Sequence, residues 1–109
     1  MAALTDFRNF KIELTEEGLQ HITSGHPEIT VEDIVAALRD PDEVRASNYN
    51  RVGSKCTSEL YYRKNSKNSL RFITVVVKLC PDGNFVSTSY TATAMRPGEV
   101  IYKKEIANE

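Results

Sequence analysis

The alternation of apolar and polar positions predicts two short helices in the first part of the chain. Thr15 is a favoured N-cap residue, two acids follow it in the first helical turn, and Gly25 marks the end of this helix. Thr30 and Asp33 have the spacing of a capping box, with Asp33 in place of the usual Glu or Gln, and apolar residues then recur at helical spacing. Pro41 ends the second helix because the residue before a proline avoids the α region.

After the second helix the period becomes strand-like. Residues 59–64 are rich in aromatic side chains, and residues 70–79 form a β-branched run that is apolar on both faces, as in a central strand. The turn signal at residues 81–84 connects this run to residues 85–93, which predicts an antiparallel hairpin.

Weaker signals lie around these elements. Residues 9–14 indicate a strand or an extended lead-in, and residues 100–102 an edge strand or a terminal helix. Residues 45–57 suggest a first strand and a loop, and residues 65–69 a polar turn. This order predicts an α+β fold in which two N-terminal helices pack on a three- to four-stranded antiparallel sheet, with residues 1–109 as a single domain.

Composition supports a globular protein, because 40% of the residues are hydrophobic and 27% are charged. The chain has neither a long apolar run nor a signal-like start, so we expect no membrane partner and a cytoplasmic location. Cys56 and Cys80, even with His21 and His26, lack the spacing of a zinc site. They are therefore expected to be free thiols or packed core residues, with no metal and no cofactor.

The net charge of −1 hides an uneven distribution. Residues 1–44 hold ten acids and three bases, whereas residues 45–78 hold eight bases and one acid. A basic middle segment is suited to a phosphate backbone. It is equally compatible with pairing to the acidic N-terminal segment inside the fold.

Two polar sets are candidates for chemistry. The first is His21 with His26, because histidine titrates near neutral pH and is the commonest general acid or base. The second lies on the predicted sheet, where hydroxyl groups follow basic residues: Arg63, Lys64, Lys78, Thr88 and Tyr90. Strand alternation places Thr88 and Tyr90 on one face and Ser87, Ser89 and Thr91 on the other. The alternative explanations are that a histidine caps a helix end and that Thr and Tyr are simply good strand formers.

Other chemistry lacks its motifs. The chain has no Gly-rich phosphate loop, no nucleophile elbow and no carboxylate cluster suited to magnesium. RNA can be cleaved without a metal, because its 2′-hydroxyl is a built-in nucleophile and the protein need only supply a base, an acid and cations.

Several segments together resemble one family. They are His21-Ile22, His26-Pro27-Glu28-Ile29, Pro41-Asp42-Glu43-Val44-Arg45, Tyr61-Tyr62-Arg63, Thr74-Val75-Val76-Val77-Lys78 and Phe85-Val86-Ser87-Thr88-Ser89-Tyr90. In order and spacing this succession, over roughly residues 10–103, looks like the small bacterial and phage nuclease-like domains grouped with barnase, EndoU, colicin-type RNases and RelE. The family's last motif usually ends Thr-Ala-Tyr, and here Ser89 replaces the alanine.

The resemblance implies a helix–helix–four-strand fold and a metal-independent endoribonuclease that acts as a toxin or mobile-element effector. Carried over by position, the site residues are His21, His26, Arg45, Tyr62, Arg63, Lys78, Thr88 and Tyr90. We predict that His21, His26, Arg63, Thr88 and Tyr90 take part in catalysis, and that Arg45, Tyr62, Lys64 and Lys78 bind substrate. The expected partners are RNA and a small acidic antitoxin or immunity protein. Two alternatives stay open: a non-catalytic RNA- or protein-binding module that uses a basic sheet face, and a structural relative with no nucleic-acid role.

Overall fold

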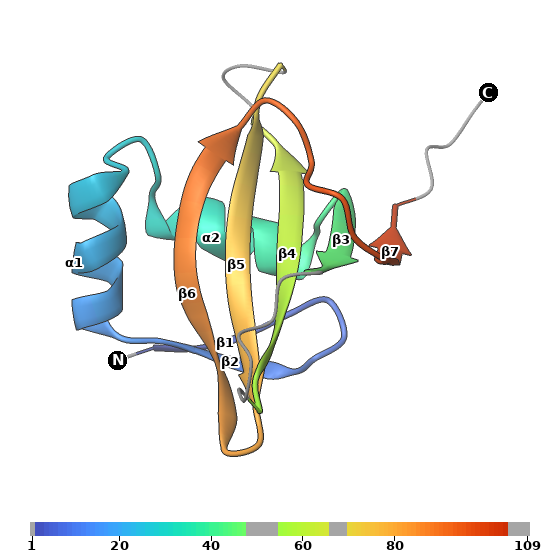
Figure 1. Ribbon diagram of the computed structural model, residues 1–109. Helices are drawn as coiled ribbons and strands as arrows, with labels where there is room; N and C mark the ends of the chain where they lie inside the picture. Colours follow the sequence, from blue (N-terminus) through green and yellow to red (C-terminus); the bar gives the residue numbers. More distant parts are fainter. Residues whose placement is uncertain (1, 48–54, 66–69, 105–109) are drawn as a thin grey trace.

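The computed structural model describes residues 2–47, 55–65 and 70–104, which form two helices and a seven-stranded sheet (Figure 1). The helices are α1 (Glu16–Gly25) and α2 (Val31–Arg39). The strands are β1 (Ala2–Thr5), β2 (Lys11–Leu14), β3 (Glu43–Ala46), β4 (Thr57–Lys64), β5 (Phe72–Cys80), β6 (Gly83–Ala92) and β7 (Val100–Lys103).

Both helices begin at the residues that the sequence predicted. The hydroxyl of Thr15 accepts a hydrogen bond from the backbone N–H of Gly18 at 2.9 Å. At α2 the Thr30 hydroxyl accepts from the N–H of Asp33, and the Asp33 carboxylate accepts from the N–H of Thr30, so the capping box is confirmed. In the part of the chain that the structure describes, no helix has the length and hydropathy of a membrane span.

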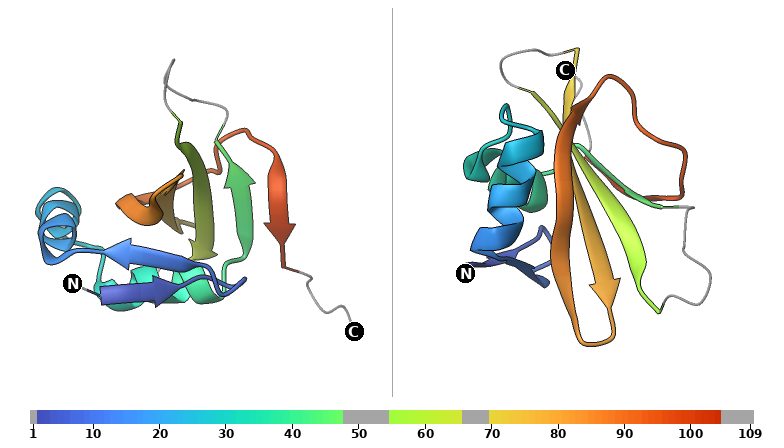
Figure 2. Two further views of the ribbon diagram at one scale, coloured as in Figure 1. Left: turned by 90° about the horizontal axis from the view of Figure 1, so that it is seen from below. Right: turned by 60° about the vertical axis from the view of Figure 1, so that its left-hand side comes forward.

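The predicted three- to four-stranded antiparallel sheet is wrong. Within the described residues the strand order is β1-β2-β6-β5-β4-β3-β7, and β2 pairs parallel to β6 while the other pairs are antiparallel. The difference comes from four strands of only four residues each, β1, β2, β3 and β7, which extend the sheet on both sides. The enlarged sheet is curled rather than flat (Figure 2, left).

The centre of the sheet follows the predicted pattern. β5 and β6 form the expected hairpin, and residues 81–84 contain its turn, where Gly83 has a φ of 148° that favours glycine. Residues 9–14 contain a strand, and residues 100–102 lie in a strand rather than in a terminal helix. Residues 48–54 of the predicted loop and residues 66–69 of the predicted turn lie outside the described residues.

The helices cover one face of the sheet, and the core lies between them and that face (Figure 2, right). Ile22 of α1 and Leu38 of α2 are buried against inward-facing strand residues such as Tyr61 and Val75. Because neighbouring residues on a strand point to opposite faces, the residues between these core positions face away from the helices.

Residues 93–99 connect β6 to β7 on the side of the sheet opposite the helices (Figure 2, right). The segment is held against β3, because the N–H of Ala46 donates to the carbonyl of Glu99 at 2.8 Å. A Cβ atom at Gly98 would lie 2.1 Å from the carbonyl oxygen of Ala46, so only glycine allows this approach.

A disulfide bond joins Cys56, just before β4, to Cys80, the last residue of β5. The expectation of free thiols or simple core packing is therefore wrong. Thr57 and Leu79 are opposite each other in the β4–β5 register, which brings the two cysteines to adjacent ends of the paired strands. A separation of 24 residues between the two cysteines does not reveal that their strands are paired, so the sequence did not predict the disulfide.

We expect reduction of this disulfide to lower the free energy of unfolding by about 3.5 kcal/mol, because a closed loop of this length restricts the unfolded chain. Urea unfolding of the wild-type protein with and without a reductant measures the loss. The Cys56→Ala, Cys80→Ala double variant is the control. Its free energy of unfolding should match that of the reduced protein and should not change when the reductant is added. Equal stability of oxidised and reduced wild type, with both thiols titrated, would contradict this expectation.

Candidate functional site

Residues that lie opposite one another on paired strands share a face. On the side away from the helices, one row across β3, β4, β5 and β6 consists of Glu43, Tyr62, Thr74 and Tyr90. The adjacent row consists of Arg45, Leu60, Val76 and Thr88. We call these two rows the helix-free face.

The helix-free face unites four of the residues that the sequence nominated: Arg45, Tyr62, Thr88 and Tyr90. Lys78 lies on the same side but four positions along β5 from Thr74, a distance of about 13 Å. It is therefore near the β5–β6 turn rather than beside the two tyrosines.

Arg63 is not part of this face. It pairs with Ile73 on the helical side, and its Nη1 atom donates to the Asp40 carboxylate at 3.0 Å. Lys64, at the end of β4, lines a recess next to α2 together with Arg63. His21 is exposed on α1, next to the buried Ile22.

His26 is the C-cap residue of α1, and its ring lies near Tyr90 of β6. Its ring centroid is 6.0 Å from that of Tyr90. On its other side, Nδ1 is 3.7 Å from a carboxylate oxygen of Glu28, and both of these side chains are 43% exposed. The same Glu28 oxygen accepts a hydrogen bond from the Thr91 hydroxyl at 3.2 Å, which fixes the carboxylate against β6. A carboxylate, an imidazole and a phenol thus follow one another at the edge of the helix-free face.

Tyr62 lies on β4, two strands from Tyr90 in the same row, and contacts the β6–β7 segment. Its hydroxyl accepts a hydrogen bond from the backbone N–H of Arg96 at 2.9 Å. Burial raises the pKa of Tyr62, the N–H of Arg96 lowers it and the phenol of Tyr90 raises it again, while Arg45 and the Arg96 side chain lower it. The net direction is upward, so Tyr62 stays protonated and neutral beside these two cations.

Arg45 is held in place by two neighbouring groups. Its Nε donates to Glu43 and its Nη1 donates to the carbonyl of Arg96 at 2.8 Å. Beside it, a pocket of about 390 Å³ opens between β3, β4 and the β6–β7 segment. The lining residues are Arg45, Ala46, Ser47, Leu60, Tyr62, Arg96 and Pro97. Two guanidinium groups at an apolar pocket favour a ligand that combines a flat apolar part with negative charge.

Thr74 lies between Tyr62 and Tyr90 in the first row and is fully buried. Among the described residues its hydroxyl oxygen has no hydrogen-bond partner. A buried polar group without a partner lowers the stability of the fold, so packing alone does not account for a threonine at this position.

We expect Thr74→Val to raise the free energy of unfolding by about 1 kcal/mol, since valine has the same shape without the unpaired hydroxyl. Urea unfolding of the two proteins measures the change. Thr91→Val is the matched control, because it removes a hydroxyl that is hydrogen-bonded and should not stabilise the protein. A loss of stability in Thr74→Val would show that the hydroxyl is satisfied in solution.

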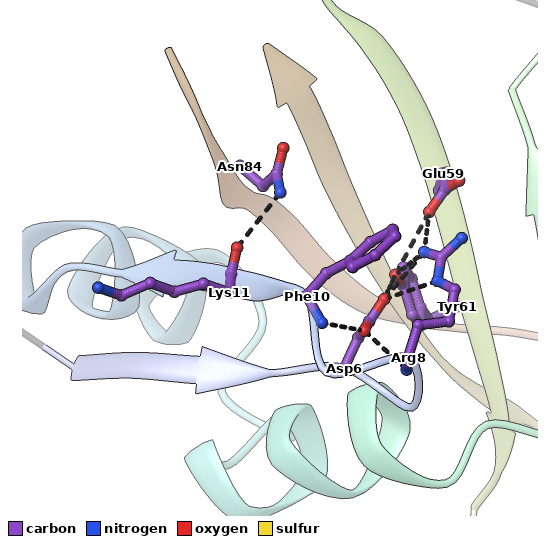
Figure 3. Close-up of polar contacts among 7 residues, drawn as sticks. All are labelled: Asp6, Arg8, Phe10, Lys11, Glu59, Tyr61 and Asn84. Atoms are coloured by element: carbon purple, nitrogen blue, oxygen red, sulfur yellow. Dashed lines mark hydrogen bonds and ion pairs between the residues drawn. The ribbon is translucent and has the colours of Figure 1, made fainter. Parts of the chain in front are cut away.

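A second polar cluster lies on the helical side, at the turn between β1 and β2 (Figure 3). Asp6 accepts hydrogen bonds from Arg8, Phe10 and Tyr61, and Arg8 also donates to Glu59 at 2.7 Å. Burial tends to raise the pKa of Asp6, but hydrogen bonds from Tyr61, Phe10 and Arg8 outweigh it and lower this pKa. Burial and the hydrogen bond to Asp6 raise the pKa of Tyr61. The carboxylate of Asp6 is saturated with donors and buried, so this cluster stabilises the fold rather than offering a site.

The structure adds three residues to the site that the sequence did not nominate: Glu28, Thr74 and Arg96. Glu28 stands in the His26-Pro27-Glu28 segment, and its nearness to a histidine was the available signal. Arg96 and Thr74 gave no local signal, because only the β6–β7 crossing and the strand register bring them to the helix-free face.

Comparisons with protein-family models, with curated proteins and with solved structures give no match for this chain. Within the described residues, no group of three or more His, Cys, Asp or Glu side chains is arranged to hold a metal ion. The functional proposal therefore depends on the residues of the helix-free face and its edge.

Proposed function

We propose that the protein is a metal-independent endoribonuclease that binds RNA at the β6 edge of the helix-free face. The observation that carries the proposal is the Glu28–His26–Tyr90 succession at the edge of a face that also holds Tyr62 and Arg45. A base and a phenol side by side are the groups that cleavage of a phosphodiester by its own 2′-hydroxyl requires, and Arg45, three strands from Tyr90, supplies positive charge to the same face.

In the proposed reaction, His26 accepts the proton of the 2′-hydroxyl. The 2′-oxygen attacks phosphorus, the bond between phosphorus and the 5′-oxygen breaks, and the phenol of Tyr90 supplies the proton to the leaving oxygen. The product strands end in a 2′,3′-cyclic phosphate and a 5′-hydroxyl. Glu28 beside Nδ1 favours the tautomer whose Nε2 is free to act as the base.

Other features agree with this proposal. The segments that resemble bacterial and phage nuclease-like domains include His26, Glu28 and Tyr90. The basic segment 45–78 supplies Arg45 to the same face. RNA as substrate, a cytoplasmic location and an acidic antitoxin or immunity partner are parts of the proposal. A disulfide is rare in a reducing cytoplasm, so alkylation of thiols in freshly lysed cells tests the location directly.

We expect purified protein to cleave a labelled single-stranded RNA equally well with and without EDTA, because no step uses a metal. An oligonucleotide of the same sequence with 2′-deoxyribose throughout should resist cleavage, since it lacks the nucleophile. Gel analysis after treatment with a phosphatase that opens cyclic phosphates identifies the product ends. Loss of cleavage in EDTA, or cleavage of the deoxy oligonucleotide, would refute this mechanism.

A second candidate is a non-catalytic RNA-binding module that uses the same face. It is favoured by the ion pairs of Arg63 with Asp40 and of Arg45 with Glu43, which reduce the positive charge available to stabilise the transition state of cleavage. These contacts leave fewer unpaired cations at the edge than the sequence predicted. Fluorescence anisotropy separates the two functions, because this module would bind labelled RNA tightly and leave it intact.

A further inference from the structure

The pocket between β3, β4 and the β6–β7 segment lies apart from the His26 edge of the helix-free face. Leu60, which is 6% exposed, and Tyr62, which is 1% exposed, line the pocket together with the exposed Pro97. Its volume of about 390 Å³ falls within the range of small-ligand pockets, roughly 300–1,000 Å³.

Charge at the pocket selects the kind of ligand. Arg45 uses Nε and Nη1 for protein contacts, and no hydrogen bond of its Nη2 to a described residue is present. Arg96 is exposed and lines the pocket, while its own backbone N–H is fixed by Tyr62. Guanidinium groups bind phosphate as paired donors and stack on nucleobases with their planar faces.

We infer that this pocket holds a single unstacked nucleotide of single-stranded RNA, with its base against Leu60 and Pro97 and its phosphate toward Arg45 and Arg96. The inference rests on the proposed function and specifies its substrate. Tyr62 and Tyr90 are two strands apart in one row, about 10 Å between their backbones, so a nucleotide in the pocket would be a near neighbour of the bond cleaved beside His26.

A pocket for one splayed base predicts a preference for single-stranded RNA. In an RNA duplex the bases are stacked and paired, and the deep major groove does not admit side chains. A pocket that encloses one base therefore rejects duplex RNA unless a base leaves the stack.

Nucleoside 3′-monophosphates test the pocket without any cleavage, because they contain no phosphodiester bond. We expect their titration into isotope-labelled protein to shift the NMR signals of the Leu60 methyl groups and the Arg96 amide in a saturable way. The methyl groups of Leu79, which pack against the helical core, serve as the internal control. Inorganic phosphate alone should leave the Leu60 methyl signals unchanged, and an equal response to phosphate would overturn the assignment of a base.

Two variants complete the test. Arg96→Ala should weaken nucleotide binding by about tenfold, the effect of losing a charged hydrogen bond. Arg71→Ala, which removes an exposed arginine outside the pocket, should change it by less than about twofold.

The two proposals fail in different ways. Saturable nucleotide binding in a protein that leaves all RNA intact would refute the nuclease and support the pocket. Cleavage that works equally on single-stranded and duplex RNA, without saturable binding at Leu60, would refute the pocket alone.

Discussion

His26→Ala should reduce the rate of RNA cleavage by about 10²- to 10⁴-fold, the range that general acid–base catalysis contributes. The imidazole is the group in the proposed site that accepts the 2′-hydroxyl proton, and neither Glu28 nor Tyr90 replaces it from its own position. Single-turnover cleavage of a labelled oligonucleotide measures the rate of this step without contributions from product release.

The same substitution should leave folding and RNA binding nearly unchanged. The His26 side chain is 43% exposed, and its contribution to the end of α1 comes from its backbone N–H, which alanine keeps. We therefore expect a change in the free energy of unfolding within about 0.5 kcal/mol. Anisotropy should show RNA affinity within a few-fold of wild type.

His21→Ala is the matched control, because it also removes one imidazole but from an exposed position on α1. It should cleave RNA at the wild-type rate. If His21→Ala lost activity and His26→Ala kept it, the base would have been assigned to the wrong histidine. If both variants cleaved like wild type, neither imidazole would be the base and the proposed mechanism would be wrong.

The parts of the fold that were predicted correctly depend on local signals. Helix caps at Thr15 and Thr30 act within one turn, and the β5–β6 hairpin is set by two long β-branched runs and a four-residue turn. The short strands are different, because four residues give too few alternations to reveal a period. Their pairing is also non-local: β2 meets β6, and β3 meets β7, across most of the chain.

In the candidate site, too, the sequence predicts what depends on neighbouring residues and misses what depends on contacts between distant segments. Alternation along one strand correctly places Thr88 and Tyr90 on one face and Ser89 and Thr91 on the other, whereas Ser87, predicted with the second group, falls at a register shift and has no partner on β5. The same rule separates Tyr62 from Arg63, which are adjacent in sequence, so both could not face one ligand. Arg96 reaches Tyr62 only through the crossing of residues 93–99, a path that no short pattern encodes.

Asp6→Ala should lower the free energy of unfolding by about 3–5 kcal/mol, which is the usual cost of removing one partner from a buried charged cluster. The Asp6 side chain is fully buried, and its two oxygens accept from the backbone N–H groups of Arg8 and Phe10, the Arg8 guanidinium and the Tyr61 hydroxyl (Figure 3). Alanine leaves these donors unpaired and the Arg8 charge balanced by Glu59 alone. Urea unfolding with linear extrapolation measures the loss.

Asp82→Ala is the control, because Asp82 is exposed in the β5–β6 turn, and its loss should change stability by less than about 0.5 kcal/mol. Asp6→Asn should be intermediate, since the amide keeps one oxygen acceptor but loses the charge. Equal stability of Asp6→Ala and wild type would mean that water replaces the carboxylate at no cost and that the cluster does not hold the β1–β2 turn.

Acid should erase the difference between Asp6→Ala and wild type. The pKa of Asp6 is lower in the folded protein than its ordinary value of 3.8, so the unfolded chain takes up the proton first as pH falls. The stabilisation from this carboxylate is thus complete above the ordinary value and is lost as pH falls through the folded pKa. Urea unfolding of both proteins at neutral pH and at successive values below 3.8 should show their free energies converging. A constant difference down to the lowest pH would show that the cost of the substitution comes from packing and not from the charge.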